Sequence, residues 1–237
     1  MTNRIDTRPN GLGDAGVHEG ARPRRLAVSA LAALSAVVAL AVAAPAAEAA
    51  SLSVGARGPA VLVLNERLAE LGYLPRRNVT TTFSRATYHA VIAFQKHERL
   101  ARDGVVGDRT KAALSEARRP RPRLAVAGRR IEVWRDRQLA LLVVNGVAMR
   151  TVAVSSGKPG YATPPGRFSV YRRERLSWSY SYSVWLPWAA YFNRGIAFHG
   201  YRSVPVYAAS HGCVRVPLPF APALYEFARL GTRVDVL

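Results

Sequence analysis

The stretch AFHGYRSVPVYAASHGCVRVP, residues 197–217, holds the only cysteine of the 237-residue chain, Cys213, and two of its five histidines, His199 and His211. A thiol becomes a nucleophile when an imidazole takes its proton. His199 precedes Cys213 by 14 positions, and a turn of that length brings two side chains together across adjacent strands. The stretch therefore predicts a reactive cysteine–histidine pair on a strand-rich fold.

Two other interpretations use the same residue types. Two histidines and one cysteine could ligate zinc, but their spacing is not that of a structural site and no fourth ligand is near. A free cysteine is also often a small buried hydrophobe. Gly212 and Arg215 suit an exposed loop better than a core, so we favour a nucleophile whose thiol has a depressed pKa.

The residues around Cys213 supply the other parts of an acyl-transfer site. Gly212 leaves the backbone free to approach a substrate, and N–H groups near Cys213 can point at a developing oxyanion. Arg215 lies on the same face as Cys213 if the segment is extended, where it could bind a substrate carboxylate. No Asp or Asn stands out as a third catalytic member, but a backbone carbonyl can also orient an imidazole.

Residues 129–237 read as mostly β, as a sandwich or a closed sheet. Ile131 and Val133 alternate with polar residues, and Asn145-Gly146 between two apolar runs is a strong hairpin signal. One helix is expected over 219–230 and a last strand over 232–237. Core packing should explain most of a cluster of aromatic residues, while a few could wall a substrate groove: Trp178, Tyr180, Tyr182, Trp185, Trp188 and Tyr191.

Residues 51–117 read as three short helices. Apolar residues at spacings of three and four predict a first helix that ends at Gly72. Ser84 and Asp108 are expected to cap the second and third helices. His89 and His97 have no matching ligands and are expected to be solvated. The run RRPRPR begins a linker over 118–128, because proline and like charges favour an extended connection.

Residues 1–50 predict a secretory signal peptide. Arg24 and Arg25 precede an uncharged run over 26–44, and Ala47-Glu48-Ala49 fits a small-x-small cleavage site. An uncleaved membrane anchor is the alternative. The expected location is outside the cell membrane, in the cell wall or periplasmic space.

The formal charge of +19 comes from basic residues spread along the whole chain. No zinc-finger spacing, RNP-like motif or helix-turn-helix supports a nucleic-acid partner. An arginine-rich solvated surface explains the charge, and attraction to an anionic polymer such as a cell wall is the functional alternative.

The pattern FHG…ASHGCVRV resembles the catalytic signature of the YkuD-type L,D-transpeptidases. The upstream segment VSSGKPGYATPPGRFSV resembles the Ser/Thr-Gly…Thr-Pro-x-Gly-x-Phe segment of that family, so the likeness covers roughly residues 129–237. Arg215 stands where some members have Asn. The resemblance implies a β-rich catalytic fold, a thiol that carbapenems acylate, and no metal or organic cofactor.

The resemblance also implies residue roles. Cys213 attacks the carbonyl between the third and fourth residues of a peptidoglycan tetrapeptide, and His199 is the base, oriented by the carbonyl of Gly200. His211, Gly212 and Cys213 form the oxyanion site. Substrate-binding roles fall to Ser210, Arg215 and Tyr191. An amine of a neighbouring stem then resolves the thioester in a 3→3 crosslink, which would serve peptidoglycan biosynthesis, cell wall organisation and cell shape.

Residues 51–117 resemble the peptidoglycan-binding domain type 1, a three-helix module, with matches that include Gly58, Leu64, Gly72-Tyr73, Phe94-Gln95 and Asp103-Gly104. Asn65 departs from the usual Gln. The likeness implies attachment to the wall, although a bundle that only supports its neighbour is the alternative. An L,D-carboxypeptidase, with water as acceptor, and a non-catalytic wall-binding protein remain open.

Overall fold

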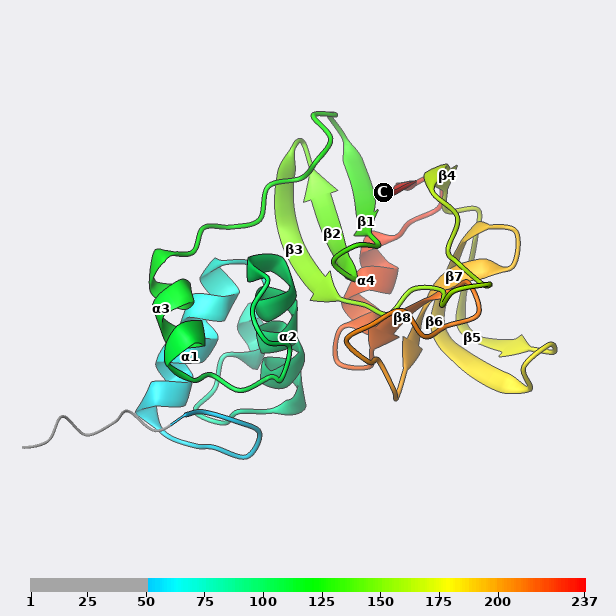
Figure 1. Ribbon diagram of the computed structural model, residues 1–237. Helices are drawn as coiled ribbons and strands as arrows, with labels where there is room; N and C mark the ends of the chain where they lie inside the picture. The colour runs from blue at the N-terminus through cyan, green and yellow to red at the C-terminus, as the bar shows by residue number, and fades with distance from the viewer. Residues whose placement is uncertain (1–50) are drawn as a thin grey trace, which may run out of the picture. The chain divides into compact units, whose positions relative to one another are not determined.

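The computed structural model describes residues 51–237 (Figure 1). The expected signal peptide and its Ala47-Glu48-Ala49 site lie outside the described residues. Within the described range, none of the helices has the length and apolar character needed to cross a membrane. The fold class is confirmed: helices come first, and a β-rich domain follows.

Residues 51–117, called the helical module below, contain three α-helices and one 3-10 turn. They are α1 (Pro59–Glu70), η1 (Arg76–Asn78), α2 (Arg85–Glu98) and α3 (Asp108–Glu116). Ser84 caps α2 as expected, in a reciprocal capping box with Thr87. The cap expected at Asp108 was wrong. Gly107 is the N-cap of α3, and Asp108 lies in the first turn, where its charge favours the helix dipole.

Residues 129–237, called the β domain below, form two sheets. Their strands are β1 (Arg129–Trp134), β2 (Leu139–Val144), β3 (Val147–Ala153), β4 (Gly166–Ser169), β5 (Arg172–Ser179), β6 (Val184–Asn193), β7 (Ile196–Tyr201), β8 (Val214–Pro217) and β9 (Arg233–Val236). One sheet has the order β3-β2-β1-β9-β4, and the other β5-β6-β7-β8. The pairs β1–β9 and β7–β8 are parallel, and the remaining pairs are antiparallel.

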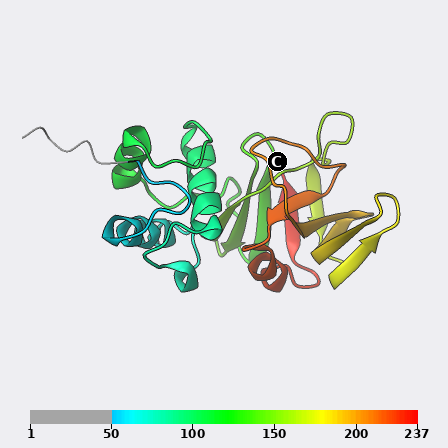
Figure 2. The ribbon, with the colours of Figure 1, turned by 90° about the horizontal axis from the view of Figure 1, so that it is seen from below.

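The expected hairpin and terminal elements are present. Asn145 and Gly146 both have positive φ, 46° and 80°, as the tight turn between β2 and β3 requires. The last helix, α4 (Ala221–Phe227), packs against β6 and β7 and is shorter than the predicted 219–230 (Figure 2). Its C-cap residue, Ala228, leaves helical dihedrals with ψ 65°, which ends the helix there.

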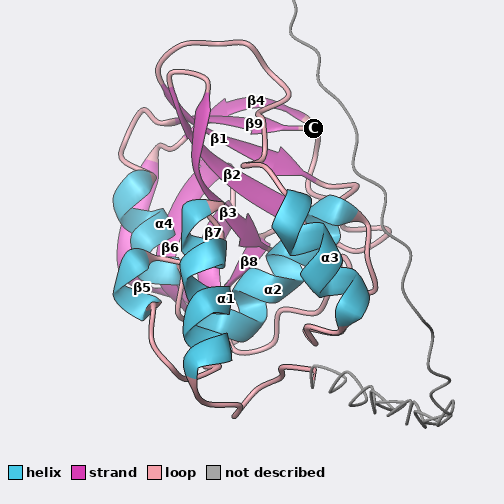
Figure 3. Cartoon of the chain, turned by 90° about the vertical axis from the view of Figure 1, so that its left-hand side faces the viewer, coloured by secondary structure: helices cyan, strands magenta, loops and turns pink. Residues whose placement is uncertain are grey.

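Helices and strands occupy different parts of the chain, apart from α4 (Figure 3). The apolar core is nevertheless continuous from the helical module into both sheets, with fully buried members such as Phe94, Leu141 and Phe198. Helix α2 packs against β2 and β3. His89, expected in solvent, is only 7% exposed, and His97 on the same helix stacks on Trp134 of β1 at 6.1 Å between ring centroids.

The segment 118–128 has no helix or strand, but the β domain holds it by a buried ion pair. Arg130 donates to Glu132 at 2.9 Å, and both side chains are essentially inaccessible to solvent. Glu132 also accepts hydrogen bonds from the backbone N–H groups of Arg123 and Leu124, at 2.8 and 3.1 Å. One carboxylate therefore satisfies both a buried guanidinium and the linker backbone.

Glu132→Ala should lower the free energy of unfolding by about 3–5 kcal/mol, because it leaves the buried charge of Arg130 without a partner. Asp136→Ala is the matched control, since Asp136 pairs with Arg123 at 2.7 Å on the exposed surface, where such pairs contribute about 0–1 kcal/mol. Urea denaturation of both variants measures the difference. Equal losses of unfolding free energy in the two variants would contradict a stabilising role for the buried Arg130–Glu132 pair.

Candidate active site

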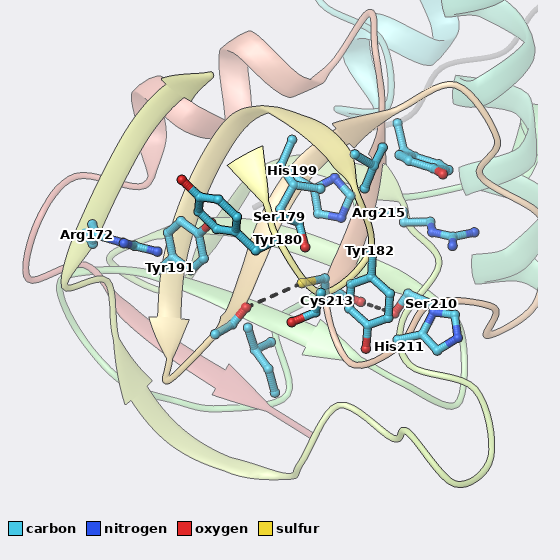
Figure 4. A pocket seen from close by; sticks show the side chains of 16 residues that line it. Arg172, Ser179, Tyr180, Tyr182, Tyr191, His199, Ser210, His211, Cys213 and Arg215 are labelled. Carbon is cyan, nitrogen blue, oxygen red and sulfur yellow. Dashed lines mark hydrogen bonds between the residues drawn. The ribbon is translucent and has the colours of Figure 1, made fainter. Parts of the chain in front are cut away.

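The parallel pairing of β7 with β8 brings the predicted pair together. His199 is opposite Arg215 in the register, and Phe198 is opposite Val214. Side chains alternate between the faces of a strand, so His199, Arg215 and the preceding Cys213 point to one face. Figure 4 shows His199 close to Cys213, with Arg215 beside them, and all three line one cavity. His199 and Cys213, 14 positions apart in the sequence, are thus brought together across adjacent strands, as expected.

The cavity has a volume of about 680 Å³. Of the predicted site residues, His199, Ser210, His211, Cys213, Arg215 and Tyr191 line it. The hairpin of β5 and β6 supplies the opposite wall with Ser179, Tyr180, Tyr182 and Leu186. The arrangement gives a partly apolar groove with its polar groups gathered near the thiol.

The imidazole of His199 is buried, with 4% of the residue exposed. Its Nδ1 lies 3.0 Å from the carbonyl oxygen of Gly200, and because a carbonyl can only accept, Nδ1 carries the hydrogen. This leaves Nε2 with its lone pair. Burial, with a smaller contribution from the nearby Arg215, lowers the pKa of His199 to about 4 despite the opposing hydrogen bond with Gly200, so the imidazole is neutral at pH 7.

Gly200 is required by packing at this place. A β-carbon there would lie 3.0 Å from Leu218 Cδ2 and 3.1 Å from Ala221 Cβ. A side chain would therefore push α4 away from β7 and disturb the carbonyl that meets His199.

The thiol of Cys213 is partly exposed, and its Sγ lies 3.7 Å from the carbonyl oxygen of Gly195. Burial raises the pKa of Cys213, an effect that a hydrogen bond with Ala197 and the charge of Arg215 only partly oppose. The expectation of a depressed thiol pKa was therefore wrong. His199 is neutral and cannot stabilise a thiolate as an imidazolium would. The resting pair is neutral thiol and neutral imidazole.

Hydrogen bonds fix the turn before Cys213. Ser210 Oγ accepts from the N–H of Gly212 at 3.1 Å and donates to the carbonyl of Cys213. Thr163 Oγ1 donates to the carbonyl of Gly212 at 2.7 Å, and Gly212 has φ 116°, a value that favours glycine. The hydroxyl of Ser210 and the N–H of Gly212 are thus engaged within the loop, which favours loop-holding roles over the predicted substrate and oxyanion contacts.

The imidazole of His211 lies between two tyrosine rings. Tyr182 stacks on it with centroids 4.8 Å apart and an interplanar angle of 27°, and Tyr161 meets it edge-on, also at 4.8 Å. His211 therefore joins the β5–β6 turn to the cysteine loop. This placement differs from that of His199, whose ring faces the thiol from a strand (Figure 4).

The expectation that core packing explains most of the aromatic cluster was wrong. Tyr180 is 88% exposed, and Tyr182, Trp185 and Trp178 are also exposed. Only Tyr191 among the six is buried, with 4% exposed, and its hydroxyl shares a hydrogen bond with Ser177 Oγ at 2.8 Å. The alternative expectation was that a few of these rings would wall a groove. Tyr180, Tyr182 and Tyr191 do line the cavity.

Two cationic side chains border the cavity. Arg215 lies over the ring of Tyr201 at 4.5 Å, and Arg172 lies over Tyr191 at 3.9 Å. The ring faces attract these cations, and Arg172 also pairs with Glu174 at 3.4 Å. Arg172 was not predicted, since a lone arginine at the start of a strand carries no motif.

Sequence reasoning also missed Tyr161 and Thr163, although both stand in the segment whose pattern was noted. Their contacts with the cysteine loop form only when that segment folds back over β8. Among residues 51–237, no group of three or more His, Cys, Asp or Glu side chains is placed to hold a metal ion.

Residues 128–236 match the model of the L,D-transpeptidase catalytic domain family, YkuD, and residues 57–114 match that of a putative peptidoglycan binding domain. No curated protein matches the chain significantly.

Two of the solved structures that resemble this chain are L,D-transpeptidases. The one from Xylanimonas cellulosilytica is 37% identical with a TM-score of 0.73, over 78% of this chain and 97% of that one. The one from Stackebrandtia nassauensis is 26% identical with a TM-score of 0.49, over 78% and 94% of the two chains. With the first likeness spanning both the helical module and the β domain, the chain belongs to the YkuD family of L,D-transpeptidases.

Proposed function

We propose that this protein is a secreted peptidoglycan L,D-transpeptidase that forms 3→3 crosslinks through a thioester on Cys213. One observation carries the proposal: a neutral imidazole, with Nδ1 engaged by a backbone carbonyl, faces the only thiol of the chain in one cavity. A base must be unprotonated to accept the thiol proton, and His199 is so at neutral pH.

In the first half-reaction, Cys213 Sγ attacks the carbonyl carbon between the third and fourth residues of a donor tetrapeptide, and its proton passes to His199 Nε2. The N–H groups of His211 and Cys213 stabilise the oxyanion, since that of Gly212 donates to Ser210 Oγ. The C–N bond breaks, and His199 returns the proton to the leaving D-amino acid. Arg215 binds a carboxylate of the donor.

In the second half-reaction, the amine of an acceptor stem attacks the thioester carbonyl. His199 takes a proton from that amine, the C–S bond breaks, and Cys213 regains its proton. Every step is proton and acyl transfer, so the proposal requires no metal and no redox cofactor.

The test is mass analysis of the products that the purified protein forms from a disaccharide-tetrapeptide. A dimer that has lost one D-amino acid supports the proposal. Tripeptide alone identifies an L,D-carboxypeptidase in which water is the acceptor. Unchanged substrate would contradict catalysis on this stem and favour a wall-binding protein.

The helical module is proposed to hold the enzyme on peptidoglycan in the cell wall or periplasmic space. A largely apolar groove of about 760 Å³ runs over it, lined by Leu52, Val63, Leu64, Val106 and Leu114 among others. Val63 is 64% exposed there, in the position of a contact residue and not of a core residue.

Full-length protein should sediment with purified cell walls at about 0.5 M salt, where the Debye length is only a few ångströms. Val63→Asp should reduce the sedimented fraction, because it places a charge in the groove. Leu230→Asp is the control, since Leu230 is 66% exposed on the β domain. If the sedimented fraction falls as salt is added and is the same in the wild type and both variants, attachment is due to the positive charge alone.

A further inference from the structure

The loop 202–213, which ends at Cys213, depends on its neighbours for its shape. The carbonyl of Ser156 accepts hydrogen bonds from the N–H groups of Ala209 and Ser210, both at 3.0 Å. Ser155 Oγ donates to the carbonyl of Tyr207 at 2.7 Å. Ser155 and Ser156, which follow β3, therefore hold the cysteine loop in its conformation.

Gln138 in turn holds Ser156 in place. Its Oε1 accepts from the N–H of Ser156 at 2.7 Å, and its Nε2 donates to Ser156 Oγ at 2.8 Å. Gln138 is 5% exposed and has φ 55°, a conformation that only supporting contacts maintain in a non-glycine residue.

The support comes from the helical module. Lys96, on α2, is inaccessible to solvent, and its Nζ donates to the carbonyls of Gln138 at 3.1 Å and Val154 at 2.9 Å. Burial lowers the pKa of Lys96 to about 7, with a contribution from Arg102.

A second contact reaches the loop directly. Arg102, which follows α2 in the helical module, donates from Nη1 to the carbonyl of Val206 at 3.3 Å. The module thus holds the cysteine loop at two places, through Gln138 and Ser156 on one side and at Val206 on the other.

We propose that Lys96 and Arg102 are positioning residues for the nucleophile, so that the helical module is part of the catalytic scaffold as well as a wall anchor. The proposal rests on the proposed function in taking Cys213 as the nucleophile. Its physical basis is that small displacements of a reacting atom are costly. A misplacement of about 1 Å can reduce a rate roughly 10²-fold.

The test uses full-length Lys96→Met and Arg102→Met with the soluble disaccharide-tetrapeptide, so that wall attachment does not enter. Lys96→Met should lower kcat about 10-fold with KM within about twofold, because the loss falls on alignment and not on binding. Arg102→Met should lower kcat about threefold, since its single contact is only partly buried. Alkylation of Cys213 by iodoacetamide should become faster in both, because a loosened loop exposes the thiol.

Arg119→Met is the matched control. Arg119 joins the same two parts of the chain, donating to the carbonyls of Ala148 and Glu70 at 3.2 and 2.6 Å, but it does not contact the loop. Its kcat and alkylation rate should equal those of the wild type. All rates are compared below the unfolding transition, as circular dichroism defines it.

Wild-type kcat and alkylation in folded Lys96→Met and Arg102→Met would overturn the proposal, as would an equal loss in Arg119→Met. If Lys96→Met does not fold, Arg102→Met decides the question. A wild-type protein without activity on the tetrapeptide would refute the proposed function instead. The alkylation rates would still decide whether the module positions the thiol.

Discussion

Cys213→Ala is expected to abolish both crosslinking and hydrolysis of a disaccharide-tetrapeptide. Cys213 is the only thiol of the chain, and it lies in the same cavity as a neutral imidazole. The fold should survive the change, because the side chain is small and partly exposed. Mass analysis of the products and a thermal unfolding curve measure the two effects.

A carbapenem supplies a second measurement on the same variant. The wild type should gain the mass of one carbapenem molecule, and Cys213→Ala should gain none. Cys213→Ser is the conservative control: it keeps the shape of the cavity but should also be inactive, since a hydroxyl gives up its proton much less readily than a thiol. Dimers formed from tetrapeptide by the alanine variant would refute the assignment of the nucleophile.

His199→Ala is expected to have the next largest effect, a loss of roughly 10²–10⁴-fold in the acylation rate, as for other removed proton-transfer groups. Acylation by carbapenem or tetrapeptide measures it. His211→Ala is the comparison within the site. Its ring is held between Tyr161 and Tyr182 and joins the wall of the cavity to the loop, so its loss should be milder. If His211→Ala is the more damaging change, the two roles are reversed.

The pH dependence tests the same role independently. Only neutral His199 can take the thiol proton, and its pKa is about 4, so wild-type acylation should fall only as the pH drops toward that value. An inflection near pH 6.5, the usual histidine range, would contradict this environment. The rate of iodoacetamide alkylation should rise in the alkaline range, because the thiol pKa is raised.

Local signals in the sequence were sufficient for the elements that carry the site. Asn145-Gly146 predicts the β2–β3 hairpin, and Ser84 predicts the start of α2, because turns and caps depend on a few neighbouring residues. The pair His199 and Cys213 could be inferred because a turn that spans their 14-residue separation can bring the two side chains together across adjacent strands. The register of β7 and β8 then accounts for their common face.

Features that depend on contacts distant in sequence were not predictable. His89 reads as a surface residue along α2, but the surrounding chain buries it. Tyr180 and Tyr182 read as core, yet they lie in the turn between β5 and β6, which forms part of the cavity wall and leaves both side chains exposed. The raised thiol pKa follows from burial, which is not visible in the motif SHGC.

The protonated state of Cys213 has a consequence for the durability of the enzyme. Peroxides react with thiolates far faster than with thiols, and the first product, a sulfenic acid, can be oxidised further to irreversible sulfinic and sulfonic acids. A thiolate stabilised at rest would meet these oxidants continuously. Because burial keeps the proton on Cys213, the reactive anion forms only as a substrate carbonyl accepts the sulfur, and the single thiol of the chain is spared between turnovers.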